Sequence, residues 1–571
     1  MPTNLPEGRW TRGCLLAAIV GLAFWLRIQQ ATESLWLDEL HTSWVVTGGA
    51  EQLVPRAAVG NYSPAYFGLV WAGTKCAGAS ELALRLPSVL AGTALVAGAC
   101  LVVVRGTGSW PAGLLAALLV AVDRHCVFYG QEARPYALVQ LVGLLHVAIF
   151  AHLVANPRVV WRAVWIATGV ALFYLHYTAV LLVAGEVVFY AVLRGFDLGR
   201  SSVAWWLGAV PGWLGSSAAS PQHAQPRLGS SAASPQYPHP ESSRLVAASG
   251  FYRWRPFAAD LAILGLGLLP AVPHLQEIAQ RRQAWSTFVR PRAWWRVWEV
   301  ADVFPLDIYV LWPLVILAVA WLGTWIFRRP RAGAPAGTGQ LRWPLLLLCW
   351  FLVPLAIAWI ATAQGAAPLF FRRYLMVAAV APLLGAALCC AACPSVGWRC
   401  VLAVTVVALS LHRGGMVAQW RQDGRVIADR NQDWRAAVRW IRERADADVP
   451  VLVRSGLIEA ERWYDSSEPL RREYCLLPVL GLYRLDQRRT SLFPLPLRPA
   501  AVLSAEGRRQ VLACGRAWCL VLGDDRSVAR FVQDLRSAWP RAGISVREVQ
   551  RFPFDQVTAL QVTVAAPSPL P

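Results

Sequence analysis

The sequence is short of charge and has almost no lysine. Only 15% of its 571 residues are Asp, Glu, Lys or Arg, whereas 56% are hydrophobic. Soluble domains carry about 25% charged residues, so this chain lacks the polar side chains that a soluble surface needs. Its 29 Trp and 19 Phe suit a protein with many lipid–water boundaries, where aromatic rings anchor helix ends. The composition excludes an ordinary soluble protein and indicates a polytopic α-helical membrane protein.

The basic residues are nearly all arginine, because Lys75 is the single lysine, and the formal net charge is +20. A charge of this size can indicate a nucleic-acid partner. The arginines, however, are spread over short loops and the C-terminal tail and do not gather on one basic face. We therefore expect no nucleic-acid partner and interpret most arginines as anchors of cytoplasmic loops.

Apolar runs long enough to cross a bilayer recur along the chain and predict about eleven transmembrane helices. The first run follows Arg9 and Arg12, and no A-x-A cleavage site comes after it. We therefore interpret it as a transmembrane helix and not as a signal peptide. The expected helices lie near 12–30, 82–104, 109–127, 136–154, 159–175, 178–193, 258–275, 308–327, 343–362, 374–393 and 398–412.

A low-complexity insert and a polar tail depart from this pattern. Residues 214–243 are rich in Ser, Pro and Ala and contain the same nonapeptide twice, which predicts a disordered cytoplasmic loop. From about residue 413 the density of charged residues rises and no spanning run follows. We expect a transmembrane domain over 1–412 and a small α/β domain over 413–571. With the N-terminus inside, an odd number of spans places the second domain outside the cytoplasm.

Hydrophobic periodicity in the tail predicts two helices and several short strands. One helix begins at Asp433-Trp434, and another follows Asp524-Asp525 and runs to about Trp539, since Asp is a favoured helix N-cap. The expected strands are 449–453, 518–522, 547–552 and 557–564.

The predicted outer loop 276–307 carries five arginines and so breaks the rule that basic residues stay in the cytoplasm. Anionic membrane lipids or a lipid-phosphate substrate would explain them. A Trp- and Arg-rich helix lying on the membrane surface is the simpler alternative.

Two adjacent carboxylates, Asp38 and Glu39, follow the first predicted helix within Ser34-Leu-Trp-Leu-Asp-Glu39. Acids so close to a membrane boundary are costly unless they are solvated or used. They could be exposed loop acids that help to orient the helix, or part of an active site at the outer mouth of a membrane enzyme. Further polar motifs on the same predicted side favour the second interpretation.

Three of these motifs are Asn61-Tyr-Ser-Pro64, Arg85-Leu-Pro-Ser88 and Gln131-Glu-Ala-Arg-Pro-Tyr136. Together with Ser34–Glu39, the series resembles the bacterial branch of the polyprenyl-phosphate-sugar glycosyltransferases, membrane enzymes of the GT-C fold. These are similar to the protein O-mannosyltransferases of glycosyltransferase family 39 and to the aminoarabinose transferases of lipid A. The later segment Phe370-Phe-Arg-Arg-Tyr-Leu375 resembles their late Arg-Tyr motif.

The resemblance implies a reaction and a base. The sugar donor already carries a phosphate leaving group that needs no general acid, so one carboxylate suffices, where a glycosidase needs two. Asp38 matches the first-loop Asp of the family. It is implied to be the general base that takes the proton of the acceptor hydroxyl, with inversion at the sugar carbon. Glu39 would bind the acceptor or a metal ion; a divalent metal at Asp38 and Glu39 is possible, but the sequence requires no cofactor.

The leaving phosphate calls for arginines, whose forked donors match phosphate oxygens. The candidates are Arg134, Arg372 and Arg373, although arginines at helix ends also snorkel to the interface. The substrate pocket would be lined by Gln131, Glu132, Tyr136, His176 and Tyr177.

The implied function is transfer of a sugar from a polyprenyl-phosphate donor to an extracytoplasmic glycolipid, envelope glycan or protein. The expected location is the bacterial cytoplasmic (inner) membrane, with the active site on the extracytoplasmic side. Two alternatives stay open: a polymerase or ligase of lipid-linked glycans, and a transporter without chemistry. Many transporters show matched, Gly/Pro-broken halves, which this sequence lacks, and its acids gather at predicted helix ends, which favours an enzyme.

Overall fold

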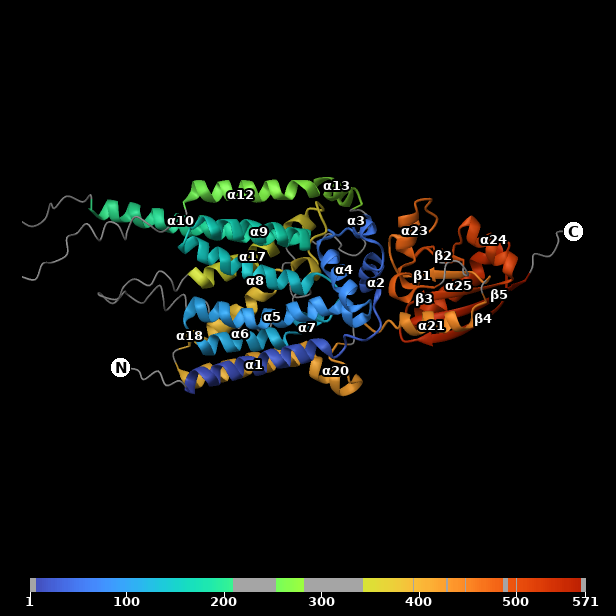
Figure 1. The fold of residues 1–571 in the computed structure, drawn as a ribbon, viewed down its shortest axis with the longest axis horizontal. Coiled ribbons are helices and arrows are strands. Elements are labelled where there is room, and N and C mark those ends of the chain that lie inside the picture. Colours follow the sequence, from blue (N-terminus) through green and yellow to red (C-terminus); the bar gives the residue numbers. More distant parts are fainter. Residues whose placement is uncertain are drawn as a thin grey trace, which may run out of the picture.

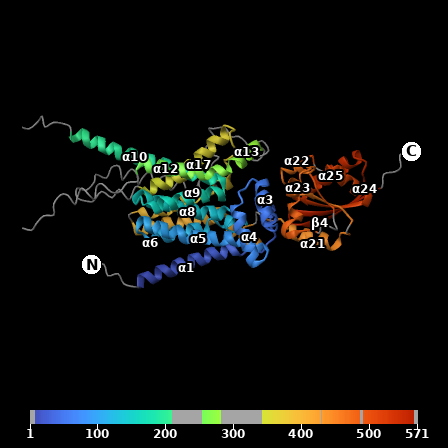
Figure 2. The same cartoon turned by 45° about the horizontal axis from the view of Figure 1, so that its top comes forward.

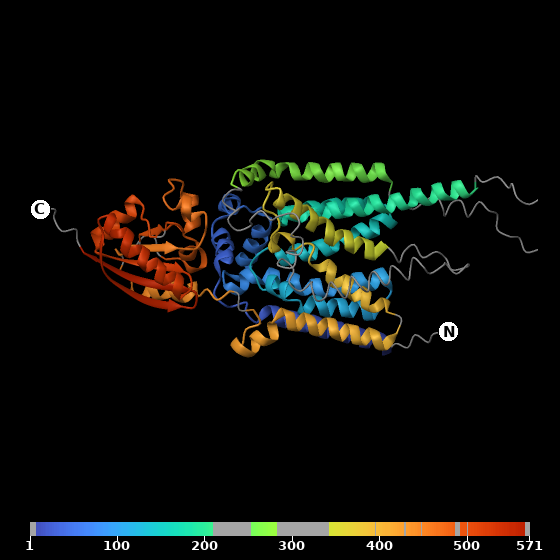
Figure 3. The ribbon, with the colours of Figure 1, turned by 180° about the vertical axis from the view of Figure 1, so that it is seen from behind.

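The computed structural model describes residues 7–208, 253–281, 342–393, 395–427, 430–446, 448–485, 491–499 and 501–565. Long helices form a bundle, and the described residues from 431 to 565, here termed the C-terminal unit, lie at one end of it (Figure 1). The view from behind shows the same arrangement, with the chain beginning at the opposite end (Figure 3). The predicted helix at 308–327, the insert at 214–243 and the loop beyond Arg281 lie outside the described residues.

Six helices of the described part are long and apolar enough to cross a membrane, and two bent pairs raise this to eight if each pair is one span. These apolar helices make the chain an integral membrane protein; the predicted number of eleven stays a prediction. The helices of the bundle include α1 (Glu7–Ile28), α5 (Glu81–Thr107), α8 (Tyr136–Ala155), α9 (Val159–Leu175), α10 (Leu181–Gly208), α12 (Trp254–Leu268), α13 (Val272–Gln280), α17 (Arg342–Ala363), α18 (Val380–Ala392) and α19 (Val396–Gly414).

Two predicted helices differ from what the structure has. The helix expected near 109–127 is present but broken: α6 (Trp110–Val122) and α7 (Arg124–Gly130) meet at a bend of 62°. Asp123 causes the break, because its carboxylate accepts the N–H of Cys126 at 2.8 Å and starts a new helix there. The helix expected from 374 begins only at Val380, and a short 3-10 turn precedes it.

Three short helices fill the space between the bundle and the C-terminal unit (Figure 2). They are α2 (Leu37–Val46), α3 (Leu53–Val59) and α4 (Ala65–Ala77). At the start of α2 the Glu39 side chain accepts the backbone N–H of Trp36, three residues earlier, which is one half of a capping box. Nearly all of α2 is buried, so this short helix is held by packing on both sides. After α19, the chain continues into α20 (Met416–Asp423) and then crosses to the C-terminal unit.

The C-terminal unit is built on a five-stranded sheet of order β2-β1-β3-β5-β4. β1 runs parallel to β2 and β3, whereas β5 is antiparallel to β3 and β4. The strands are β1 (Val451–Arg454), β2 (Leu492–Pro494), β3 (Arg516–Leu522), β4 (Ser545–Phe554) and β5 (Val557–Ala565). The helices are α21 (Trp434–Arg444), α22 (Ala460–Trp463), α23 (Pro469–Cys475), α24 (Ala505–Cys514) and α25 (Asp525–Arg541).

Two large cores are arranged along the bundle axis. One lies among the long helices. The other is shared: Leu40 and Trp44 of α2 pack in the same cluster as Trp434 and Leu477 of the C-terminal unit. The C-terminal unit is therefore joined to the end of the bundle through a buried apolar interface as well as through polar contacts.

Candidate active site

Asp38 and Glu39 lie in the first turn of α2 and bind different arginines. Asp38 is 23% exposed, and its Oδ2 accepts a hydrogen bond from Nη1 of Arg373 at 2.7 Å. Arg373 belongs to the predicted late motif, 335 residues further along the chain. The structure thus brings the first and the last of the sequence motifs into contact.

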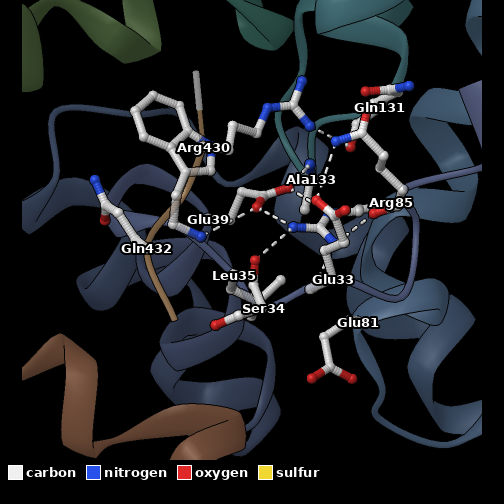
Figure 4. Close-up of polar contacts among 12 residues, drawn as sticks. Glu33, Ser34, Leu35, Glu39, Glu81, Arg85, Gln131, Ala133, Arg430 and Gln432 are labelled. Carbon is white, nitrogen blue, oxygen red and sulfur yellow. Dashed lines mark hydrogen bonds and ion pairs between the residues drawn. The ribbon is translucent and has the colours of Figure 1, made fainter. Parts of the chain in front are cut away.

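Glu39 has no exposed surface. Its two carboxylate oxygens accept from Nε and Nη2 of Arg85 at 2.7 and 2.5 Å, and also from the backbone N–H groups of Ala133 and Trp36 (Figure 4). Burial raises the pKa of this carboxyl, but the Arg85 charge and these hydrogen bonds outweigh burial and hold the pKa below its ordinary value. The carboxylate therefore fastens α2 to two other segments and has no oxygen left for an acceptor or a metal ion.

The contacts of Arg85 show what the Arg85–Ser88 motif does in the structure. Besides Glu39, its guanidinium donates to four backbone carbonyls in the loop between α1 and α2, at 2.6 to 3.2 Å. Ser88 completes the arrangement, because its hydroxyl donates to the carbonyl of Arg134 at 2.9 Å. This motif shapes the loop that leads to Asp38.

Arg134 lies next to the backbone of Asp38 and is 2% exposed. Its Nη1 donates to the backbone carbonyl of Asp38 at 3.1 Å and lies 3.4 Å from Nδ1 of His41. The guanidinium stacks 4.1 Å from the ring centre of Tyr62, and its Nε has no partner among the described residues. Arg134 therefore brings a positive charge to Asp38 without binding its carboxylate.

These charges decide the protonation state of Asp38. Burial alone raises the pKa of the carboxyl, but the charges of Arg373 and Arg134, with His41, hold that pKa below its ordinary value. Burial, and then the Arg134 charge, lower the pKa of His41 to about 3, so its imidazole is neutral at pH 7. Asp38 is accordingly ionised over the whole physiological range.

Aromatic side chains form the wall around this charge cluster. The hydroxyls of Tyr62 and Tyr136 lie 3.4 Å apart, and the His176 ring lies 5.6 Å from Tyr136 and 5.8 Å from Tyr374. The C-terminal unit adds Tyr474, whose ring lies 5.4 Å from that of His41. The predicted residues Tyr136 and His176 are therefore part of the wall.

Gln131 and Glu132 are both buried. The Gln131 side-chain amide donates to the carbonyl of Leu26 at 2.6 Å, which ties this loop to α1. Glu132 has one carboxylate oxygen without a partner among the described residues. Burial, reinforced by the nearby Asp38 and Glu39 charges, raises its pKa to about 8 against the opposing effect of Arg430, so Glu132 is mostly protonated at pH 7.

Two predicted residues have other surroundings. The Tyr177 hydroxyl lies 2.8 Å from Nδ1 of His274, whose Nε2 contacts the carbonyl of Ala58 at 3.2 Å. Tyr177 thus connects its segment to α13 and α3. Arg372 is partly exposed and adjoins Arg373 in the 3-10 turn Arg372–Leu375.

The two carboxylates suggested for a metal ion do not converge on one point, since Asp38 binds Arg373 and Glu39 binds Arg85. Among the described residues, no three His, Cys, Asp or Glu side chains are grouped in a way that could hold a metal. The side chains around α2 therefore do not fit a metal ion bridged by Asp38 and Glu39.

The sequence interpretation gave no role to His41, Tyr62 or Arg430. His41 comes three residues after Asp38, a spacing that places both on one face of a helix, so it could have been found. Tyr62 lies inside a motif that was recognised. Arg430 gave no local signal, yet its Nη1 donates to the carbonyl of Gln131 at 2.9 Å and its guanidinium lies 4.2 Å from the Phe128 ring centre.

No family model matches the sequence, and no curated protein matches it. Solved structures do. A crystal structure of ArnT from Cupriavidus metallidurans bound to undecaprenyl phosphate matches with a TM-score of 0.53 and 12% identity, over 99% of this chain and 100% of that chain. The fold is that of the GT-C membrane glycosyltransferases.

Two further solved structures match with lower scores. ArnT from the same organism in the apo state gives a TM-score of 0.36 at 12% identity, over 99% of this chain and 100% of that chain. The archaeal oligosaccharyltransferase AglB from Archaeoglobus fulgidus, in complex with an inhibitory peptide and a dolichol-phosphate, gives 0.47 at 11% identity, over 99% and 75%. The GT-C fold that the motif series predicted is confirmed by the match to ArnT bound to undecaprenyl phosphate.

Proposed function

We propose that the protein is a membrane glycosyltransferase that moves a sugar from a polyprenyl-phosphate donor to an acceptor hydroxyl outside the cytoplasm. The observation that carries the proposal is the partly exposed pair of Asp38 and Arg373, 2.7 Å apart. It combines an ionised carboxylate with a cation suited to a phosphate, at one end of a GT-C helix bundle. The match to a structure described as bound to undecaprenyl phosphate supports a lipid phosphate as the donor's leaving group.

In the proposed reaction the acceptor oxygen attacks the anomeric carbon as the bond from that carbon to the phosphate oxygen breaks. Asp38 takes the hydroxyl proton, and the electron pair of the broken bond leaves with the polyprenyl phosphate. A single displacement from the opposite face inverts the configuration at the anomeric carbon. The acceptor is a glycolipid, an envelope glycan or a protein.

Arg373 has two tasks in this proposal. Before the donor binds, it neutralises Asp38. A donor phosphate would compete for the same guanidinium, whose fork of donors suits phosphate oxygens, and Asp38 would become a stronger base as its partner is shared. Arg372 is the second candidate for the phosphate. Arg134 is buried under Tyr62, so we assign it the role of fixing the position and charge of Asp38.

Glu39 is given a different role from the one its sequence position suggested. We propose that it positions α2 through Arg85 and takes no part in the reaction. Tyr62, Tyr136 and His176 are proposed to contact the substrate, because Tyr62 stacks on Arg134 next to Asp38 and the other two rings adjoin Tyr62. The remaining parts of the proposal are the bacterial cytoplasmic membrane as the location and its outer side as the side of the site.

The test is to delete the gene and compare envelope glycans and glycolipids by mass spectrometry, and then to restore wild-type or Asp38→Asn protein. We expect deletion to remove one sugar modification and Asp38→Asn to restore it roughly 10²–10⁴-fold less efficiently than wild type, the usual effect of losing a general base. Asp38→Asn keeps the size of the side chain, so equal amounts of protein in the membrane serve as the control. Full restoration by this variant would exclude Asp38 as the base.

A further inference from the structure

The C-terminal unit contacts α2 at both ends, on either side of Asp38. The Tyr483 hydroxyl accepts the N–H of Leu35, two residues before α2, at 2.8 Å, and Oε1 of Gln432 accepts the N–H of Leu37, the first residue of α2, at 2.9 Å. Both accepting side chains come from a part of the chain about four hundred residues later. The first N–H groups of a helix have no partner within the helix, so Gln432 completes the beginning of α2, and Tyr483 fixes the segment that leads into it.

Both accepting groups are themselves held in place. The Tyr483 hydroxyl donates to Oε1 of Glu81 at 3.1 Å, and Tyr483 is 5% exposed. Oε1 of Gln432 also accepts from Nε1 of Trp434 at 3.1 Å. Gln432 lies beside the cluster formed by Glu39 and Arg85 (Figure 4). The two accepting oxygens are therefore held in place, and their hydrogen bonds fix the position of the start of α2.

The C-terminal unit also forms hydrogen bonds with the later part of α2. Leu482 donates its N–H to the Ser43 hydroxyl at 2.8 Å, and Nε1 of Trp44 donates to Glu473 at 3.1 Å. Gly481 has a φ of +63° and lies so close that a Cβ there would come within 2.6 Å of the Ser43 oxygen and 2.9 Å of the Trp44 nitrogen. The close approach requires glycine.

We propose that the C-terminal unit sets the position of Asp38, with Gln432 and Tyr483 as positioning residues for the transfer reaction. The inference rests on the proposed function. Asp38 directly follows Leu37, so a shift of the first turn moves its carboxylate relative to Arg373, which belongs to a different part of the bundle. A displacement of about 1 Å in an active site can cost on the order of 10²-fold in rate.

The test uses the full-length protein with Gln432→Leu, Gln432→Glu and Tyr483→Phe. Glu keeps an accepting oxygen for the N–H of Leu37, and Leu removes it at similar size. Arg442→Ala is the matched control, because Arg442 is exposed and contacts the carbonyl of Arg484 beside Tyr483. Three quantities are measured: the sugar modification in cells, hydrogen exchange of peptides covering 34–40, and the affinity for undecaprenyl phosphate by tryptophan fluorescence in detergent.

We expect Gln432→Leu and Tyr483→Phe to speed exchange at 34–40 and to lower product formation roughly 10- to 10²-fold. Their affinity for undecaprenyl phosphate should stay within about twofold of wild type, since no phosphate-binding arginine is touched. Gln432→Glu should keep most of the activity, and Arg442→Ala all of it. This combination separates positioning from a general loss of fold, which would lower lipid binding and protein level as well.

Other outcomes overturn the inference. If exchange at 34–40 does not change, or if it quickens while product formation stays at the wild-type level, the C-terminal unit does not set the position of Asp38. If Gln432→Glu is as inactive as Gln432→Leu, the accepting oxygen is not the cause. Asp38→Asn is run beside these variants: unchanged product in that variant contradicts the proposed function itself, whereas loss of product there with wild-type product in Gln432→Leu and Tyr483→Phe contradicts only the positioning role.

Discussion

Asp38 and Glu39 are adjacent and carry the same carboxyl group, yet they face different sides of α2 in different surroundings. On the closed side, Glu39 is fully buried and both oxygens are occupied by Arg85 and backbone donors. On the open side, Asp38 keeps 23% of its side chain exposed and has one arginine partner, itself 25% exposed. A buried, fully paired charge holds structure together, whereas a partly exposed pair can exchange one partner for a substrate. We therefore assign Glu39 a structural role and Asp38 a role in the reaction.

The largest effect that tests this division is expected from Glu39→Gln. The change leaves Arg85 buried beside a neutral partner, and breaking a buried ion pair costs about 3–5 kcal/mol. Thermal unfolding in detergent should show this loss of stability. Asp38→Asn is the control: its pair with Arg373 is 23–25% exposed, so solvent screens part of the loss and the cost should stay clearly below that of Glu39→Gln. Equal losses in the two variants would contradict the distinction between a closed and an open side.

A second effect, of intermediate size, concerns Glu132 on the closed side. Its folded-state pKa of about 8 lies above the value of about 4.3 for an unfolded Glu. Between these values the folded protein holds a proton that the unfolded chain has lost, so Glu132 makes stability fall as the pH rises through this window. Glu132→Gln has no such proton.

We therefore expect the unfolding temperature of Glu132→Gln, relative to wild type, to increase from pH 5 to pH 8. The relative free energy of unfolding should change by roughly 3 kcal/mol between the two pH values, because each pH unit over which only the folded protein holds the proton is worth about 1.4 kcal/mol. Unfolding curves of both proteins at the two pH values measure it. A difference that does not vary with pH would show that Glu132 is ionised in the folded protein.

The smallest effect is expected for Tyr177→Phe. The variant loses the hydrogen bond to His274, worth about 0.5–1.5 kcal/mol, and should keep its sugar transfer, because Tyr177 connects helices and does not border the pair of Asp38 and Arg373. Product formation in cells and thermal unfolding check the two parts. A fall in product of tenfold or more, at normal protein level, would return Tyr177 to the substrate contacts that the sequence predicted.

Much of the chain could be predicted from its sequence where local patterns decide. The long apolar runs predicted α1, α5, α8 and α17 close to their observed bounds. In the C-terminal unit, β1, β3, β4 and β5 lie where strands were expected. Asp433 and Asp524 cap α21 and α25. Such features depend on hydrophobic periodicity and on capping over a few residues, and both patterns can be recognised in the sequence alone.

Other elements could not be predicted in this way. β2 has only three residues and ends in Pro494, so it exists through pairing with β1 and has no pattern of its own. The break at Asp123 lies within an apolar run that reads as one helix. In each case a side-chain or strand contact decides the local structure against the hydrophobic pattern.

For the site, the sequence alone determined which short motifs carry the polar groups, because acids and arginines at predicted helix ends stand out in an apolar chain. It could not decide which of two adjacent acids is buried. Only the tertiary structure decided that, by placing Arg85 against Glu39 and Arg373 against Asp38. The physical reason is that the environment of a carboxylate depends on which charges and donors the fold brings within about 3 Å, and here these come from segments up to 335 residues away.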